Sequence, residues 1–333
     1  MTLSLSDAVP LGLPWPSLRA FVALALEHGL TVASAMKHAD HRFDPAAFRV
    51  PHGSPFRIAD RPTSAGDELG GKKAAAEALA ADVSQLRDAQ ERLYADGSRA
   101  ILIVLQGMDA SGKDGLIRHV MGGINPQGCR VESFKAPNPE ELRHHFLWRP
   151  MRFLPQRGMI AIFNRSYYEE VLVVRVHPKL LEPQKLVPFG TLDDLWRQRY
   201  AEIVEFEAMM VRHGTSVIKF FLHVSREEQR KRLLARLEDP SKRWKFDERD
   251  LAERACWKEY ETAIDAMLPA TSTPEAPWHV IPADDKWYAR AAVADIIAAH
   301  VDAVDLDFPK VSPATAAHYE SLANQLAREE RPA

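Results

Sequence analysis

Cysteine is scarce in this sequence, with only Cys129 and Cys256 among 333 residues. Two isolated cysteines exclude a disulfide framework and a cysteine-ligated metal site, so we expect a reducing, cytoplasmic location. An excess of charge of one sign is also missing, since 43 Lys and Arg stand against 46 Asp and Glu. The formal net charge of -3 argues against broad binding to nucleic acid, although it leaves room for a local basic groove.

Long uninterrupted apolar runs are absent as well. The most apolar stretch near the start, residues 17–36, contains Arg19, Glu27 and His28 and follows no cationic segment. A membrane span and a signal peptide are therefore both poor interpretations. We expect residues 1–45 to form a helical appendage that docks on the main body or on a partner subunit.

From residue 71 onward the chain alternates between helical and strand patterns. Apolar runs at strand length occur at 99–106, 129–135, 159–164, 215–224 and 278–282. Helical patterns occur at 71–95, 112–121, 139–148, 166–176, 192–212, 226–238, 247–267 and 287–303. This order predicts an α/β domain over residues 46–310, with a central parallel sheet of about five strands flanked by helices. Residues 311–333 are expected to form a surface helix or tail.

A glycine-rich loop follows the first strand and opens the next helix. It reads GMDASGKD over residues 107–114, which gives the G-x4-G-K spacing of a P-loop. In that context backbone N–H groups turn inward around a phosphate, and Lys113 reaches a terminal phosphate oxygen. The other residues expected to line the cradle are Gly107, Ala110, Ser111 and Gly112.

Two acidic residues make this P-loop unusual. Asp114 stands where most nucleoside triphosphatases have a hydroxyl that binds magnesium, and Asp109 adds a second carboxylate. Carboxylates beside a phosphate site require a compensating cation, so we expect Mg²⁺ or Mn²⁺, held by Asp109 and, through water, by Asn164. The alternative is that both carboxylates only cap the loop.

The strand at 159–164 ends in a second polar cluster. Ligands of open α/β sheets bind at the carboxyl ends of the strands, which places Asn164 and Arg165 beside the P-loop. Arg165 can clamp a phosphate, or it can pair with Glu169 or Glu170 within its own segment. Glu169 can support the metal or the acceptor, or it can serve the helix dipole, and Glu170 is a further candidate to support the acceptor or the metal.

Basic residues are concentrated in residues 226–245, where eight Lys or Arg stand against four acids. Arg232 and Arg236 lie four positions apart, and Lys245 follows Trp244. We interpret residues 226–250 as a phosphate-binding lid; a solvated charged face and a nucleic-acid contact are the alternatives. Lys135, at the end of another strand, is a further candidate for a phosphate contact.

Taken together, these residues resemble the polyphosphate kinase 2 family over about residues 48–309. The resemblance rests on RVP at 49–51, GMDASGKDG at 107–115, INP at 124–126, SFK at 133–135, FLWR at 146–149, FNRSYYEEVLVVRV at 163–176, Glu228-Gln229 with Arg232, WK at 244–245, APW at 276–278 and DKWY at 285–288.

The resemblance implies a thymidylate-kinase-like P-loop fold and Mg²⁺-dependent phosphoryl transfer between inorganic polyphosphate and a nucleotide. It implies that Asp109, Lys113, Asn164, Arg165 and lid arginines such as Arg232 act at the site. Asn164 stands where members restricted to nucleoside diphosphates have Asp, so AMP, ADP or both are the expected acceptors. Glu170 stands where AMP-accepting members usually have Asp. Similar proteins are often homotetramers, so we expect a homo-oligomer, either tetramer or dimer, that binds purine nucleotides but neither nucleic acid nor a membrane.

Two other functions fit the P-loop itself. One is an ATP-dependent nucleoside monophosphate kinase of the same fold, and the other is a non-catalytic regulatory protein that binds nucleotides. The sequence contains no N-K-x-D motif for guanine recognition.

Overall fold

A computed structural model describes residues 42–66, 68–304 and 306–329. Its centre is a sheet of five parallel strands in the order β2-β3-β1-β4-β5. The strands are β1 (Ala100–Gly107), β2 (Cys129–Ser133), β3 (Ile160–Asn164), β4 (Thr215–His223) and β5 (Trp278–Pro282). The predicted α/β class with a five-stranded parallel sheet is therefore confirmed.

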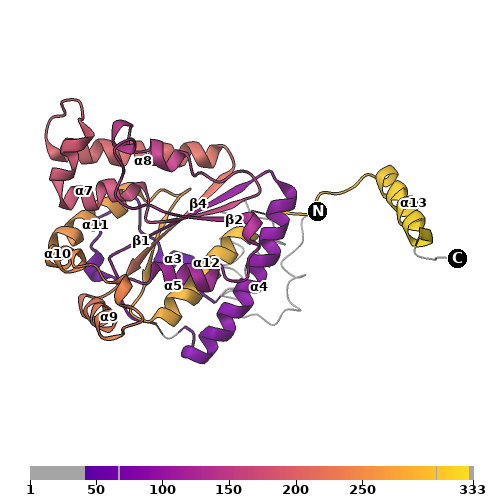
Figure 1. Ribbon diagram of the computed structural model, residues 1–333, viewed down its shortest axis with the longest axis horizontal. Helices are drawn as coiled ribbons and strands as arrows, with labels where there is room; N and C mark the ends of the chain where they lie inside the picture. The colour runs from indigo at the N-terminus through magenta and orange to yellow at the C-terminus, as the bar shows by residue number, and fades with distance from the viewer. Residues whose placement is uncertain (1–41, 67, 305, 330–333) are drawn as a thin grey trace, which may run out of the picture.

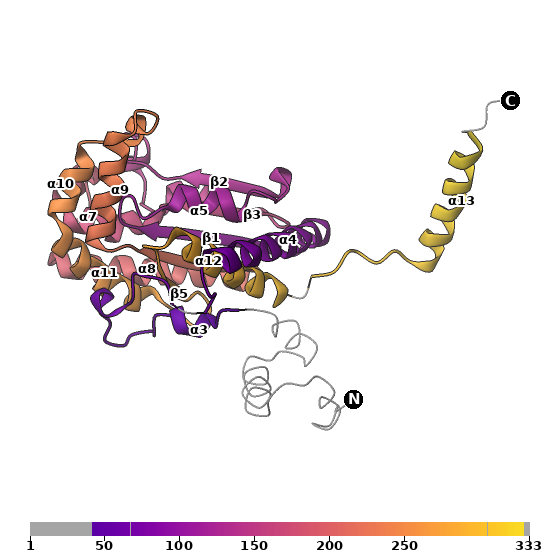
Figure 2. The ribbon, with the colours of Figure 1, turned by 90° about the horizontal axis from the view of Figure 1, so that it is seen from below.

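Helices cover both faces of this sheet (Figures 1 and 2). Successive residues of β1 face opposite layers, because side chains alternate along a strand. Ile101 and Ile103 pack with one set of helices, whereas Leu102 and Val104 pack with the other. The first set comprises α4 (Lys72–Asp96), α5 (Lys113–Val120) and α12 (Lys286–Asp302). The second comprises α7 (Val173–Val176), α8 (Leu192–Arg212) and α11 (Trp257–Thr271).

The carboxyl ends of the central strands place the candidate site. The loop 107–112 leaves β1 and enters α5, and β3, paired with β1, ends at Asn164. On the other side of β1, β4 leads into α9 (Arg226–Glu238) and then α10 (Arg249–Ala255). Segments far apart in the sequence thus converge at one edge of the sheet, as in other open α/β folds.

Shorter elements complete the chain. They are the α-helical turns α3 (Pro45–Phe48) and α6 (Trp148–Met151) and the 3-10 turns η3 (Ile58–Asp60), η4 (Pro126–Gly128), η5 (Glu141–Arg143), η6 (Tyr167–Val171), η7 (Pro178–Gln184) and η8 (Arg243–Lys245). The remaining helix, α13 (Pro313–Glu329), stands away from the body at the end of an extended segment (Figure 1).

Three helices expected from the sequence are wrong in detail. The helix expected at 139–148 is replaced by η5 and α6, because the backbone is extended at His144, with φ -111° and ψ 164°, and interrupts the helical turns. The segment 166–176 winds as η6 and α7 rather than one α-helix. The helix expected at 247–267 divides at Cys256, whose amide donates to the carbonyl three residues earlier, in Glu253.

The expected N-terminal appendage, residues 1–45, lies almost entirely outside the described residues, so its structure stays a prediction. In the described part of the chain, no helix has both the length and the apolar character needed to cross a membrane. The division into residues 1–45, 46–310 and 311–333 also stays a prediction.

Candidate functional site

The loop after β1 has the backbone of a phosphate cradle. Gly107 has a φ of 148° and Gly112 a φ of 109°, which are values that side chains oppose. A Cβ at Gly107 would lie 2.7 Å from the carbonyl oxygen of Leu222. Ala110, between them, is also left-handed, with a φ of 60°. The N–H groups of Asp109, Ala110 and Gly112 have no hydrogen-bond acceptor among residues 42–66, 68–304 and 306–329, so this loop can offer them to an anion.

Lys113 folds back over the cradle. Its ammonium donates hydrogen bonds to the carbonyl oxygens of Gly107 at 2.6 Å and Met108 at 3.3 Å, and to Oγ of Ser111 at 3.4 Å. Burial and the neighbouring Arg165 lower the pKa of Lys113 to about 8, against the opposing charges of nearby carboxylates. A phosphate oxygen would replace weak carbonyl partners with a charged one.

Arg165 and Asp109 form the ion pair at the mouth of the loop. NH2 of Arg165 donates to Oδ1 of Asp109 at 2.6 Å. Arg165 has a φ of 61°, an unusual value for a residue with a side chain, and its side chain is 42% exposed. Such strain marks a position where the surrounding structure dictates the direction of a side chain. The predicted neighbourhood of Arg165 and the P-loop is therefore present in the structure.

Glu169 lies close enough to this ion pair to interact electrostatically with both Arg165 and Asp109. Its carboxylate accepts a 3.0 Å bond from Nε2 of Gln106, the side chain near the end of β1. Burial raises the pKa of Glu169, although Arg165, the Gln106 bond and Lys113 act in the opposite direction. Gln106 was not predicted from the sequence. It could have been noticed as a polar residue within the otherwise apolar run of β1.

Asn164 contacts the second unusual carboxylate. Its Nδ2 donates a 2.7 Å hydrogen bond to Oδ1 of Asp114 in the first turn of α5. Asp109 and Asp114 therefore each have a partner from the end of β3.

Glu170, expected to support the acceptor, is turned toward a separate polar cluster. Its carboxylate accepts 2.8 Å and 2.9 Å bonds from Arg199 and Gln184. The Arg199 side chain is only 3% exposed, so Glu170 neutralises a buried guanidinium. Neither Arg199 nor Gln184 was singled out from the sequence.

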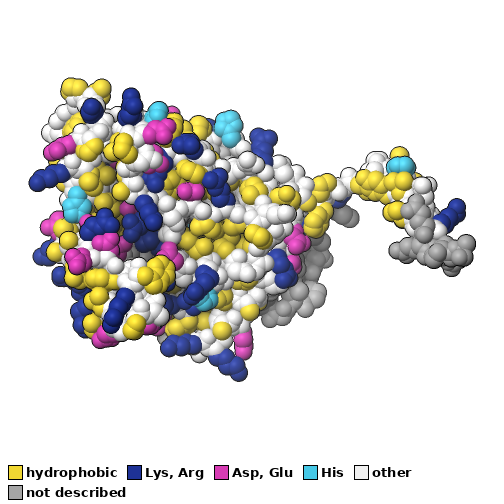
Figure 3. All heavy atoms as spheres, in the orientation of Figure 1, with side chains coloured by type: hydrophobic (Ala, Val, Ile, Leu, Met, Phe, Trp, Pro, Cys, Tyr) yellow, Lys and Arg dark blue, Asp and Glu magenta, His cyan; other side chains and the backbone are white. Residues whose placement is uncertain are grey.

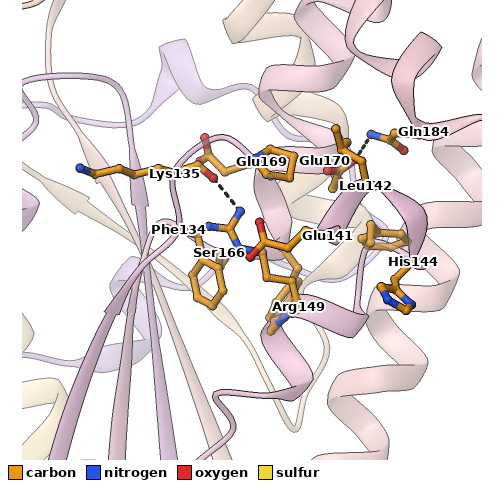
Figure 4. Close-up of a pocket in the computed structure, with 14 residues that line it drawn as sticks. Phe134, Lys135, Glu141, Leu142, His144, Arg149, Ser166, Glu169, Glu170 and Gln184 are labelled. Carbon is orange, nitrogen blue, oxygen red and sulfur yellow. Dashed lines mark hydrogen bonds and ion pairs between the residues drawn. The ribbon is translucent and has the colours of Figure 1, made fainter. Parts of the chain in front are cut away.

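The four remaining basic candidates occupy different environments. Lys135 is exposed, and in Figure 4 its ammonium points away from the Glu170 and Gln184 side of the neighbouring pocket. Arg236 pairs with Asp250 at 3.2 Å, while the ammonium of Lys245 lies 5.0 Å from the centre of the Trp244 ring. Arg232 is buried, and its guanidinium contacts backbone carbonyls. Figure 3 shows Lys and Arg side chains mixed with acidic ones at the end of the molecule that carries α9 and α10.

A pocket opens beside the strand ends (Figure 4). It contains aromatic rings and an ion pair, in which Nε of Arg149 lies 3.2 Å from Oε1 of Glu141. The ring of His144 stacks on Trp148, with the ring centroids 4.0 Å apart. The lining residues are Phe134, Lys135, Pro137, Glu141, Leu142, His144, Phe146, Arg149, Pro150, Ser166, Tyr167, Glu169, Glu170 and Gln184.

Comparison with known proteins decides which P-loop family this is. The family model for Polyphosphate kinase 2 (PPK2) matches residues 70–309. The chain belongs to the polyphosphate kinase 2 family. The resemblance noted from the motifs is thereby confirmed.

Relatives within the polyphosphate kinase 2 family cover most of the chain. It is 45% identical over 281 residues to the ADP-polyphosphate phosphotransferase of Rhodopseudomonas palustris, spanning 84% of this chain and 97% of that protein. It is 47% identical over 246 residues to the AMP/ADP-polyphosphate phosphotransferase of Meiothermus ruber, spanning 74% of this chain and 88% of that one.

A solved polyphosphate kinase 2, from Arthrobacter aurescens TC1, has the same architecture. Its TM-score to this structure is 0.78 at 39% sequence identity, with 86% of this chain and 98% of that chain covered. The fold is therefore that of a P-loop kinase.

Proposed function

We propose that this protein transfers phosphoryl groups reversibly between inorganic polyphosphate and a purine nucleotide, with AMP, ADP or both as acceptors. The observation that carries the proposal is the position of Glu169. It lines the pocket and is also coupled electrostatically to Lys113 and Arg165 of the phosphate cradle. A cradle for a phosphate chain and a pocket for a second substrate thus meet at one residue.

The cradle suits the polyphosphate chain. Loop amides, Lys113 and Arg165 present fixed positive groups to successive phosphates. The relatives from R. palustris and M. ruber are both named for polyphosphate. Lys135, Arg236 and Lys245 are proposed to extend this positive track, with residues 226–250 acting as the lid. Binding that depends on so many cations should weaken steeply with added salt.

The pocket suits the nucleotide acceptor. Phe134 and Phe146 offer apolar surface to a base, while the Arg149 and Glu141 pair offers charged groups to its polar edge or to the ribose. We propose that the acceptor phosphate lies on the Glu169 side of this pocket, next to Arg165. Glu170 lines this pocket together with Gln184, which it holds in place, and it also neutralises the buried guanidinium of Arg199.

The residues present fit a magnesium ion brought in with phosphate. Among the described residues, no group of three or more His, Cys, Asp or Glu forms a metal site. Magnesium, however, usually takes only one or two carboxylates and completes its shell with water and substrate phosphates. Asp109 provides one carboxylate, and the buried Oε1 of Gln106 has no donor in the described part of the chain, which suits an ordered water. We propose that Asp109 holds the ion, with Asn164 and Glu169 reaching it through water.

The proposed mechanism is a direct in-line displacement. Lys113, the loop amides and Arg165 hold the donor chain, with its terminal phosphoryl group in line with the acceptor phosphate. When bound, Mg²⁺ would neutralise charge that develops on the phosphate oxygens. Catalysis then comes from orientation and fixed charge rather than from a covalent intermediate.

A product profile tests the proposal. The protein is incubated with polyphosphate, Mg²⁺ and AMP, ADP, GMP or GDP in the absence of ATP, and the nucleotides are separated by chromatography. We expect ADP or ATP to form, and Lys113→Ala to abolish this formation. Lack of any polyphosphate-dependent product in the wild-type protein would contradict the proposal.

The same assay separates the alternatives. An ATP-dependent nucleoside monophosphate kinase would phosphorylate AMP only when ATP is supplied. A regulatory nucleotide-binding protein would hydrolyse a nucleotide slowly and transfer nothing. We also propose a homo-oligomeric state, which light scattering of the full-length protein would measure.

A further inference from the structure

We propose that Arg232 is a positioning residue, which fixes the shape of the phosphate cradle by holding its backbone carbonyls from α9. It does not itself bind the phosphate chain. The inference deepens the proposed function, on which its activity tests rest, and it departs from the lid role expected for Arg232 from the sequence.

Every donor of the Arg232 guanidinium is already used. A guanidinium has five N–H donors. Nε of Arg232 donates to Glu228 at 2.8 Å. NH1 donates to the carbonyl oxygens of Ala110 at 3.0 Å and Ser111 at 2.9 Å. NH2 donates to the carbonyl oxygens of Ala283 at 2.6 Å and Asp284 at 2.8 Å. These five hydrogen bonds leave no N–H for a phosphate oxygen.

The neighbouring Gln229 extends the same contact. Its Nε2 donates a 3.0 Å bond to the carbonyl oxygen of Asp109. Gln229 and Arg232 are both buried, and they lie three positions apart on one face of α9. With Lys113 on Gly107 and Met108, a side chain contacts each of the five carbonyls from residue 107 to residue 111.

These contacts explain how the cradle keeps its strained shape. A peptide group has its N–H and C=O on opposite sides, so the donors that hold the carbonyls of Asp109 and Ser111 outward turn the N–H groups of the next residues, Ala110 and Gly112, inward. Ala110, which is held at a φ of 60°, lies at the centre of the clamped segment. The fork of Arg232 also joins the P-loop to the loop after β5, because NH1 and NH2 reach different segments. A lysine cannot reproduce such a fork.

Arg165 shows the contrasting environment. The Arg165 side chain is 42% exposed, and among the described residues its guanidinium donates one hydrogen bond, to Asp109. The structure thus assigns the two arginines different roles. Arg165 faces the substrate, and Arg232 faces the protein.

The test compares Arg232→Lys and Arg232→Gln with Gln229→Met, and with Arg197→Gln as the matched control. Arg197 lies on α8, outside residues 226–250, and pairs with Asp194 at the surface. For each variant, kcat and KM for polyphosphate are measured at several salt concentrations. We expect Arg232→Lys to lower kcat by about ten- to a hundredfold, since small misplacements of a catalytic frame have effects of this size. Gln229→Met should lower kcat by less, and Arg197→Gln should not change it.

The salt dependence of Arg232→Gln distinguishes positioning from direct contact, because glutamine removes the charge that lysine keeps. If Arg232 only positions the loop, the slope of log(kcat/KM) against log[salt] stays that of the wild type. If Arg232 binds phosphate, the slope falls in magnitude by about one. That result, or wild-type kinetics for Arg232→Lys, would overturn the inference. Should both Arg232 variants fail to fold, Gln229→Met decides, since wild-type kinetics in that variant would overturn the inference.

A second measurement does not require phosphoryl transfer. Hydrogen–deuterium exchange of the Ser111 N–H, which donates to the Met108 carbonyl within the clamped segment, should accelerate about tenfold in Arg232→Lys, and exchange in α8 should not change. Unchanged exchange in the loop would overturn the inference even if the wild-type protein transferred no phosphate. Conversely, an inactive wild type with faster exchange in the variant would contradict only the proposed function.

Discussion

The Nδ2 amide of Asn164 donates a 2.7 Å hydrogen bond to Oδ1 of Asp114, joining the end of β3 to the first turn of α5. The residue that follows the P-loop lysine is thus tied to the strand that delivers Arg165. A change at position 164 therefore alters the charge balance of the cradle as well as the acceptor side. A carboxylate there would face that of Asp114 at hydrogen-bonding distance.

We expect Asn164→Asp to lower kcat/KM for AMP by about tenfold or more at pH 7, because a hydrogen bond to a charged group is replaced by repulsion. ADP should be affected less, as the resemblance to diphosphate-specific relatives implies. Additional Mg²⁺ should restore activity in Asn164→Asp, since an ion can bridge two carboxylates, but not in Asn164→Ala. Equal loss in both variants, with no response to Mg²⁺, would show that charge is not the cause.

The pKa of Lys113 predicts how donor binding changes with pH. Burial lowers this pKa to about 8 in the folded protein. A phosphate chain binds the charged form, so kcat/KM for polyphosphate should be level below pH 8 and fall about tenfold per pH unit above it. Lys113→Arg, with whatever activity it retains, should show no such fall. A wild-type profile that stays level to pH 10 would contradict the assignment.

The same lowered pKa has an opposite consequence for stability. Between pH 8 and the ordinary lysine value of 10.5, the unfolded chain binds more protons at this position than the folded chain does. The contribution of Lys113 to the free energy of unfolding should therefore increase as pH rises through that window, which makes the folded protein more stable. Urea unfolding of the wild type and of Lys113→Met at pH 7.5 and pH 10 would measure this contribution as the difference between the two proteins.

A buried ion pair lies beneath the helical layer of α8. Lys219 donates to Glu207 at 2.5 Å, and Glu207 also accepts bonds from the hydroxyls of Tyr167 and Tyr168. Lys219→Met should lower the free energy of unfolding, measured by urea denaturation, by about 3–5 kcal/mol, because it leaves the Glu207 carboxylate buried without a cation. The double variant Lys219→Met with Glu207→Gln should recover more than half of that loss. If the losses of unfolding free energy in the two single variants simply add in the double variant, Lys219 and Glu207 do not stabilise the fold as a pair.

Glu170 offers a test of the pocket wall. Glu170→Asp has a shorter side chain, which cannot hold both Arg199 and Gln184, and should reduce the unfolding free energy by about 1–3 kcal/mol. Glu170→Gln, as the control, keeps the length but loses the charge that neutralises Arg199. The ratio of AMP to ADP turnover should shift in the shorter variant because the wall is displaced. An unaltered unfolding free energy in both variants would show that Glu170 does not support the pocket wall.

The sequence predicted the regular elements well where burial dictates them. The five expected strands coincide with β1 to β5 within one or two residues, because apolar runs of strand length between helices have few other solutions. Tyr94, in the last turn of α4, is 52% exposed, whereas Leu86 and Leu93 on the same helix are buried. A helical pattern identifies a face, but the last turn of a helix can extend beyond the core.

The site was only partly predictable for a similar reason. Lys113, Asp109 and Arg165 are recognisable from a motif and from the ends of strands. Gln229 belongs to a motif that carries the family resemblance, but its role and that of Gln106 are not recognisable, because they depend on contacts with residues 120 and 63 positions away. The sequence also predicted that Arg232 binds phosphate as part of a basic lid. That prediction could not distinguish a buried guanidinium from an exposed one, because a segment rich in arginine does not reveal which side chains face the solvent.

The clamp on the P-loop carbonyls also determines when the cradle can form during synthesis. The residues of the loop leave the ribosome early, but Gln229 and Arg232 follow 120 and 122 positions after the carbonyls that they hold. Ala283 and Asp284, which complete the fork, are later still. A nascent chain that contains the whole glycine motif should therefore have little affinity for phosphate chains. Competence to bind them would arise in a late step of folding, together with the docking of α9.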